Sequence, residues 1–291
     1  MIIIQLHGGL GNQLFQYAVG RQISINNGID FKLDTNLYTN KSLRKYQLFQ
    51  LNIKAQQATF DETNRLLPYY YRRGLMSKVI NRYFKNLLRD YYLSTGKIIK
   101  EKENYHFDPD ILTINKSVFL CGYWQNEKYF DDIRALIKQE FQLKDGIASN
   151  YFQKIQKDIL WTNSISIHIR RGDILGHSEK YIYLDDYFKK AMNYILNRME
   201  DAVFYVFSDD LIWARENIKS TRPVVYVDSC GNDCEDLLLM SACKHHIIAN
   251  STFSWWGAWL GSEDSIVVSP STWFTDGRKT YDFIPERWLR L

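Results

Sequence analysis

The chain has 291 residues, of which 45% are hydrophobic and 24% charged, and its formal net charge is +4. These values are ordinary for a soluble globular protein of one large or two small domains. No apolar run approaches the ~20 residues that a membrane span needs. The four cysteines are too few and too scattered for a secreted disulfide scaffold.

The chain begins with an apolar strand at residues 2–6 and a helix predicted over residues 12–26. The turn between them contains Gly8, Gly9 and Gly11. Glycine permits positive φ angles and a close approach of the backbone to a ligand. We therefore expect Gly9, Gly11 and Asn12 to contact a sugar or a diphosphate.

A second strand is predicted at residues 30–34, and the pattern is then irregular from about 40 to 115. Within this region, residues 75–89 have the spacing of a basic amphipathic helix. Such a helix can lie on an anionic membrane, although a solvated basic face over the core is the commoner arrangement. The segment 118–124 reads as a strand, and a helix is predicted over 127–141.

From residue 163 onward, short apolar strands alternate with helices. The predicted strands are 163–169, 203–207, 223–227, 246–249 and 265–268, and the predicted helices are 185–199, 210–217, 235–244 and 254–260. This alternation is typical of a parallel, Rossmann-like domain. We place the domain boundary near residue 150, which gives domains 1–150 and 151–291. The final segment could pack back on the first domain.

The strand at residues 163–169 ends in the sequence His-Ile-Arg-Arg-Gly-Asp. Arg170 and His168 share one face of the strand, whereas Arg171 points the other way. A guanidinium fork at the carboxyl end of a parallel strand suits a phosphate or diphosphate. The alternative is that one arginine pairs with Asp173 or Asp209. His168 could contact the nucleotide or be a buried structural histidine.

A second polar turn follows the strand at residues 246–249 and opens an aromatic helix. Ser251 and Thr252 can cap that helix, and its free amides together with the helix dipole attract anionic oxygen. The alternative is an ordinary N-cap. We expect Ser251, Thr252 and Phe253 to hold a diphosphate together with Arg170.

Four segments, read in order, resemble the signature blocks of the alpha-1,2-fucosyltransferases of glycosyltransferase family 11. They are "GGLGNQLFQYA", "HIRRGD", "FSDD" and "DLLLMSACKHHIIANSTFSWWGAWL". The resemblance implies a GT-B-like α/β fold, with two Rossmann-like domains facing across a cleft. It also implies inverting, metal-independent transfer of L-fucose from GDP-beta-L-fucose to O2 of a terminal beta-galactoside, in glycan or surface polysaccharide biosynthesis. One departure is Ile174, where the family commonly has an aromatic residue.

The animal members of this family carry a Golgi anchor, and Met1 here leads directly into a strand, without a signal peptide. The chain therefore looks like a soluble bacterial form, expected in the cytoplasm. It could be peripheral on the inner face of the membrane. Nothing in the sequence indicates nucleic-acid binding.

Fucosyl transfer also needs recognition of guanine and activation of the acceptor hydroxyl. A carboxylate of Asp209 or Asp210 can accept both N1–H and the amine of guanine, and the other can cap the following helix. For the general base, Asp173 is the first candidate and Glu179 the second. We expect no metal, because the D-x-D triplet at 108–110 contains a proline typical of a turn.

Three rival interpretations remain. Gly9-Leu-Gly11 follows a strand, and Asp34 lies 34 − 11 = 23 residues beyond Gly11, as in an NAD(P)-binding fingerprint, but Leu14 replaces its third glycine. A non-catalytic carbohydrate-binding protein would also use many aromatic residues. A zinc set of Cys230, Cys234, Cys243 and His245 is disfavoured, because Cys243 falls on the apolar side of its helix.

Overall fold

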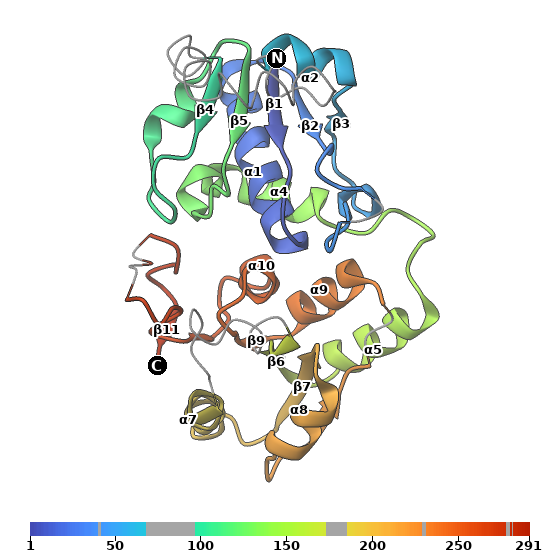
Figure 1. Ribbon diagram of the computed structural model, residues 1–291. Helices are drawn as coiled ribbons and strands as arrows, with labels where there is room; N and C mark the ends of the chain where they lie inside the picture. Colours follow the sequence, from blue (N-terminus) through green and yellow to red (C-terminus); the bar gives the residue numbers. More distant parts are fainter. Residues whose placement is uncertain (40–41, 68–96, 173–184, 229–230, 278–279, 281) are drawn as a thin grey trace. The chain divides into compact units, whose positions relative to one another are not determined.

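The computed structural model describes residues 1–39, 42–67, 97–172, 185–228, 231–277, 280 and 282–291 (Figure 1). Its chain divides into two compact units. Unit 1 comprises Met1–Leu48 and Ile53–Glu140, and unit 2 comprises Phe49–Asn52 and Phe141–Leu291. No helix among the described residues has the length and hydropathy to cross a bilayer.

Within the described part of unit 1, a five-stranded sheet has the order β3-β2-β1-β5-β4. Every pairing in it is parallel, and the strands are β1 Ile2–Gln5, β2 Phe31–Asp34, β3 Gln56–Gln57, β4 Ile98–Lys100 and β5 Val118–Cys121. The strands β1 and β5 are almost entirely buried, which explains why they read as continuous apolar runs. Helix α1 (Leu10–Asn27) completes the predicted strand–helix–strand start, and α2 (Phe60–Leu66) lies in the region expected to be irregular.

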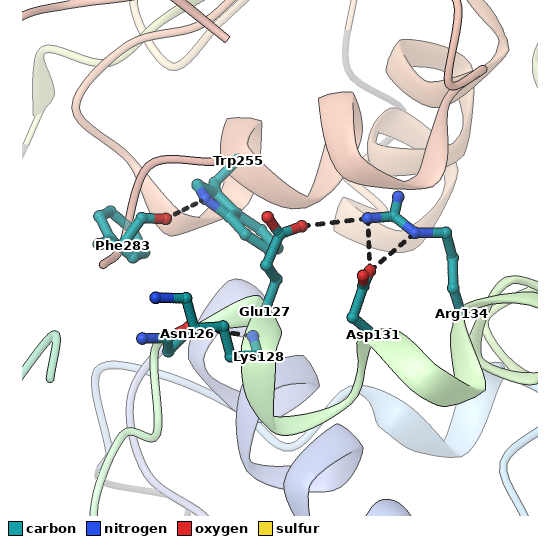
Figure 2. Close-up of polar contacts among 7 residues, drawn as sticks. All are labelled: Asn126, Glu127, Lys128, Asp131, Arg134, Trp255 and Phe283. Carbon is teal, nitrogen blue, oxygen red and sulfur yellow. Dashed lines mark hydrogen bonds and ion pairs between the residues drawn. The ribbon is translucent and has the colours of Figure 1, made fainter. Parts of the chain in front are cut away.

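The helix predicted over residues 127–141 is wrong in its first half. Two short 3₁₀ turns, Glu127–Tyr129 and Asp131–Ile133, precede α4 (Arg134–Glu140). Phe130 between them has φ −149° and ψ 11°, outside the helical region, and its side chain is fully buried. Packing of this phenylalanine therefore interrupts the helix. Arg134 closes the bend with ion pairs to Glu127 at 3.0 Å and Asp131 at 2.7 Å, while Asn126 caps the first turn (Figure 2).

Within the described part of unit 2, a six-stranded sheet has the order β11-β10-β9-β6-β7-β8, again with every pairing parallel. Its strands are β6 Asn163–Ile169, β7 Ala202–Ser208, β8 Val224–Tyr226, β9 His245–Ile247, β10 Val267–Ser269 and β11 Leu289–Arg290. Its helices are α5 Asn150–Leu160, α7 Asp185–Leu196, α8 Leu211–Asn217, α9 Asp233–Ala242 and α10 Thr252–Leu260. The alternation of strands and helices predicted from residue 163 onward is confirmed.

The C-terminal tail extends the sheet of unit 2, because β11 pairs with β10. Just before β11, Phe283 accepts a 2.8 Å hydrogen bond from the indole of Trp255 on α10 (Figure 2). The rings of Phe283 and Trp259 are both stacked on Trp255. These contacts fix α10, whose amino end is the phosphate site predicted from the sequence.

The main division of the chain falls between Glu140 and Phe141, whereas the sequence places the boundary near residue 150. The difference arises because the residues just after Phe141 pair with a short earlier segment, Phe49–Asn52. Leu51 and Leu143 form an antiparallel bridge, flanked by backbone hydrogen bonds between residues 52 and 142 and between 144 and 50. This pairing of Phe49–Asn52 with residues 142–144 is called the clasp below.

Candidate functional site

Arg170 leaves the carboxyl end of β6, the strand between β9 and β7. The side chains of Ile165, Ile167 and Ile169 are buried in the core of unit 2, which fixes where β6 ends. The next residue, Arg170, is half-buried, and its Nη1 donates to Ser251 Oγ at 3.4 Å. The structure thus brings together the arginine and the serine that the sequence predicts for one diphosphate.

Ser251 is the N-cap of α10, and its hydroxyl accepts from the Phe253 amide at 3.3 Å. It is buried, whereas Thr252 and Phe253 are partly exposed. The ordinary capping role and the proximity to Arg170 therefore occur together at this serine. A helix amino end beside a guanidinium is an arrangement that favours anionic oxygen.

His168 lies two residues before Arg170 and packs against Phe253, with the ring centroids 5.5 Å apart. Burial, reinforced by the charge of Arg170, lowers the pKa of His168 to about 3. The imidazole is therefore neutral near pH 7. Among the described residues, its buried Nδ1 has no hydrogen-bond partner.

The two carboxylates after β7 divide their roles. Asp209 accepts hydrogen bonds from the amides of Arg171 at 2.8 Å and Gly172 at 3.0 Å. Asp210 caps α8 by accepting from the Trp213 amide at 3.0 Å. One carboxylate therefore holds the loop after β6 and the other starts a helix. An ionised carboxylate has about four acceptor positions, so neither role exhausts the acceptor capacity of Asp209.

Arg171 takes the structural role that the sequence left open for one of the two arginines. Its guanidinium lies 4.0 Å from the centroid of the Trp213 ring and pairs with Asp210 at 3.5 Å. This stacking orients Arg171 toward α8. Arg170 is then the arginine beside the amino end of α10.

In unit 1, the glycine-rich turn connects β1 with α1. Gly8 has φ 84°, and a Cβ atom there would lie 2.4 Å from Asn12 Nδ2. Gly9 is the N-cap of α1 at φ −77°, and Gly11 is buried inside the helix. The residue that must be glycine in this turn is therefore Gly8, although the predicted ligand contacts are Gly9, Gly11 and Asn12.

We expect Gly8→Ala to destabilise the protein by roughly 1 to 3 kcal/mol, because it combines a left-handed backbone with a steric clash. Gly9→Ala is the matched control, since its new Cβ would meet only Arg44 Cδ at 4.0 Å. Alanine is a poorer N-cap than glycine by up to about 1 kcal/mol, so the loss of stability at Gly9 should be smaller than the loss at Gly8. Urea denaturation of both variants provides the measurement. Equal losses of stability would contradict this assignment.

Asn12 is positioned by its neighbour in space, Gln125, whose Nε2 donates to Asn12 Oδ1 at 2.8 Å. Gln13 is a structural residue, because its buried amide donates to the Lys45 carbonyl at 2.8 Å and accepts from the Gln47 amide at 3.0 Å. Gln13 therefore fixes the segment at residues 45–47 to α1. Asn12 remains the polar residue of this turn that is a candidate for contact with a ligand.

His7, which lies between β1 and the glycines, was not among the site residues predicted from the sequence. Gln16 Oε1 accepts from the His7 amide at 3.1 Å, and its Nε2 lies 2.9 Å from His7 Nδ1 and 3.0 Å from the Gly122 carbonyl. Because the Gln16 nitrogen is the donor, Nδ1 of His7 accepts and Nε2 carries the proton. Burial lowers the pKa of His7. His7 is thus a neutral hydrogen-bond donor, and its position directly before the glycines was the available signal.

Several predictions fall outside the described residues. They concern Asp173 and Glu179, the candidate bases, and also Cys230 and the basic segment 75–89. Among the residues that are described, no three His, Cys, Asp or Glu side chains converge as they would around a metal ion.

The acidic residue on which the dinucleotide-binding interpretation depends, Asp34, has a structural role. Asp34 is buried at the end of β2, and its Oδ1 accepts from the backbone and side-chain amides of Asn36. Leu14 is buried where that fingerprint needs a glycine. Asp34 therefore stabilises a turn in this chain.

Comparison with known proteins gives matches that cover most or all of this chain. The chain is 33% identical over 304 residues to an alpha-1,2-colitosyltransferase of Escherichia coli, with 100% of this chain and 99% of the relative covered. It is 34% identical to the O-antigen biosynthesis glycosyltransferase WbnK of Escherichia coli, with 98% and 99% covered. A galactoside 2-alpha-L-fucosyltransferase of Bos taurus is 24% identical, with 92% and 67% covered.

Among solved structures, the fucosyltransferase NodZ from Bradyrhizobium matches with a TM-score of 0.55 and 14% identity, covering 89% of this chain and 92% of that one. Such a match concerns the fold, and it confirms the predicted GT-B-like α/β class built from two parallel sheets. The model of the family described as Glycosyl transferase family 11 matches residues 1–290. The chain therefore belongs to glycosyl transferase family 11.

Proposed function

We propose that the chain transfers L-fucose from GDP-beta-L-fucose to O2 of a terminal beta-galactoside, with inversion and without a metal ion. The observation that carries the proposal is Arg170 beside Ser251, at the amino end of α10. Family membership supports glycosyl transfer, and the names of relatives at 24–33% identity support the 1,2 linkage. The reaction belongs to glycan or surface polysaccharide synthesis.

In this mechanism, the bond between C1 of fucose and the diphosphate oxygen breaks while the acceptor O2 forms a bond to C1 from the opposite face. Arg170 and the amide of Thr252 stabilise the charge that develops on the departing GDP, while the Phe253 amide remains bonded to the Ser251 hydroxyl. The proton of the acceptor hydroxyl passes to Asp173, or to Glu179 if Asp173 is a partner of the arginines. No step requires a cation other than Arg170.

Guanine recognition is assigned to Asp209. Its carboxylate already fixes the loop that presents Arg170, since it accepts the amides of Arg171 and Gly172. Its remaining acceptor positions can take the N1–H and amine of guanine, a pair of donors that adenine does not offer. Asp210 is occupied by the α8 cap. His168 presents a neutral ring to the nucleotide.

A colitosyl donor is the second candidate, because the name of a relative at 33% identity specifies it. Colitose is L-fucose without the 3-hydroxyl group. A site that hydrogen-bonds this hydroxyl rejects the deoxy sugar strongly, whereas a site that does not bond it accepts both. The two GDP-sugars therefore need to be compared directly.

We expect GDP to bind far more tightly than ADP or UDP, and transfer to a beta-galactoside to survive excess EDTA. Calorimetry with the three nucleotides and product analysis with GDP-fucose and GDP-colitose make the comparison. Equal nucleotide affinities would reject the guanine assignment. Loss of turnover that manganese restores would reject the metal-free mechanism.

A further inference from the structure

Unit 1 contains a cavity of about 280 Å³ at the carboxyl end of β4. This volume is close to the lower end of the ~300–1,000 Å³ range of small-molecule sites, which suits a ligand as small as one sugar ring. Its walls come from the loop after β4 and the segment after β5, and they include Glu101, Lys102, His106, Phe107, Trp124 and Tyr129.

One wall of the cavity is aromatic and rigid. Phe107 and Tyr129 meet edge to face at 4.9 Å, and Trp124 and Tyr129 at 6.0 Å. The Tyr129 hydroxyl accepts from the Asp108 amide at 2.9 Å and donates to the His106 carbonyl at 3.3 Å, so it is occupied within the loop. Trp124 and Tyr129 are almost fully buried and support Phe107, which is partly exposed and can offer its ring to the C–H face of a sugar.

The backbone around the cavity is held in an unfavourable conformation. Among the described residues, the non-glycine positions with positive φ are Trp124 at 56° and Tyr105 at 65°, and both belong to the segments that form the walls. The carboxylate of Glu101 accepts the amides of Tyr123 at 2.6 Å and Trp124 at 3.0 Å, which maintains the turn. Burial raises the pKa of Glu101. Strained backbone of this kind gathers at ligand sites.

The charges around the cavity disfavour an anionic ligand. The lining residues include two lysines, Lys100 and Lys102, and three acidic residues, Glu101, Glu103 and Asp108. Lys102 is paired with Asp108 at 2.9 Å. A neutral polyhydroxylated ligand suits this mixture, because its hydroxyl groups can both donate to carboxylates and accept from lysines.

The cavity adjoins the glycine-rich turn within unit 1. Trp124 lines the cavity, and the next residue, Gln125, donates to Asn12 Oδ1 at 2.8 Å. The preceding residue, Tyr123, packs its ring 4.3 Å from that of His7. Residues 123–125 thus join the cavity to the turn that the sequence assigns to sugar binding.

We propose that this cavity is a subsite for a neutral pyranose of the acceptor glycan, the residue to which the terminal galactose is linked. The proposal rests on the proposed function, since it assumes that the acceptor is a glycan. It predicts that the protein prefers a galactosyl disaccharide to methyl beta-galactoside, because only the disaccharide fills the cavity.

The experiment compares kcat/KM for methyl beta-galactoside and for beta-1,3- and beta-1,4-linked galactosyl disaccharides. Phe107→Ala removes part of the aromatic wall, and we expect it to reduce the preference for the disaccharide about tenfold. Phe60→Ala, at a 57% exposed phenylalanine on α2, is the matched control and should keep the preference. Glu103→Trp, a filling variant at an exposed wall residue, should also lower the preference. Urea denaturation verifies that each variant is folded, because these residues lie in unit 1 and the proposed GDP contacts lie in unit 2.

An unchanged preference in folded Phe107→Ala and Glu103→Trp overturns the subsite, as does a wild-type protein without any preference. If the wild-type protein transfers to no galactoside, the proposed function fails on its own. The subsite is then judged by saturation-transfer NMR with the same disaccharides. Saturation transfer to the reducing-end sugar that is seen with the wild-type protein and lost with Phe107→Ala supports the subsite. No saturation transfer to that sugar with the wild-type protein rejects the subsite.

Discussion

Arg170→Lys is expected to weaken both GDP binding and turnover by about 30- to 150-fold. Lysine keeps the charge but loses the planar fork that can hold two oxygens of a diphosphate at once. A charge-assisted, two-pronged contact contributes roughly 2 to 3 kcal/mol, which gives this range. Calorimetry with GDP and steady-state kinetics with GDP-fucose measure the two effects.

The matched control is Arg215→Lys. Arg215 lies on α8 in the same unit, pairs with Asp228 at 3.4 Å, and its side chain is 51% exposed. An exposed pair of this kind contributes at most about 1 kcal/mol, so this variant should bind GDP nearly as the wild type does. If both variants lose GDP affinity to a similar extent, replacing any arginine of this unit by lysine has the same effect. The assignment of Arg170 to the diphosphate would then fail.

Asp173→Asn is expected to lower turnover by about 100-fold or more while GDP affinity stays nearly intact. The amide cannot accept the proton of the acceptor hydroxyl, whereas the nucleotide contacts assigned to Arg170 and Ser251 do not involve it. Single-turnover kinetics together with calorimetry separate the chemical step from binding. Glu179→Gln serves as the comparison and should have a mild effect.

A different outcome would reassign the base. If Asp173→Asn abolishes GDP binding or unfolds the protein, Asp173 is a structural partner of the arginines, and Glu179 becomes the candidate. If both variants keep full turnover, neither carboxylate is the base. His7 would not replace them, because the hydrogen bond from Gln16 to its Nδ1 leaves the proton on Nε2.

The sequence predicted the sheet of unit 2 closely, because buried parallel strands are short apolar runs with few alternatives. The strand at 163–169 has the same limits as β6. The pairing of Arg170 with Ser251 was also predictable, since the carboxyl ends of neighbouring parallel strands meet at one edge. The alternation of side chains along the strand already favoured Arg170 over Arg171 for the diphosphate, but the sequence could not show that Arg171 stacks on Trp213.

Other features depended on packing between distant segments. The interruption at Phe130 occurs because burial of its ring overrides the helical pattern of its neighbours. The cavity after β4 requires a left-handed Trp124, which the Glu101 carboxylate holds from 23 residues away in sequence. No periodicity or sequence motif predicts a contact of this kind. The hydrogen bond by which the Gln16 amide fixes the tautomer of His7 could not be predicted from the sequence either.

The clasp of Phe49–Asn52 on residues 142–144 bears on how this enzyme can be recombined with its relatives. A chimera joined near residue 150 would take α5 and the following sheet from one parent and both clasp segments from the other. A chimera joined at residue 140 would separate Gln142 and Lys144 from the backbone groups that they bond at residues 52 and 50. A chimera that exchanges the C-terminal half at residue 140 should therefore take residues 49–52 from the same parent as that half. Such a chimera has one crossover at residue 140 and two more that flank residues 49–52.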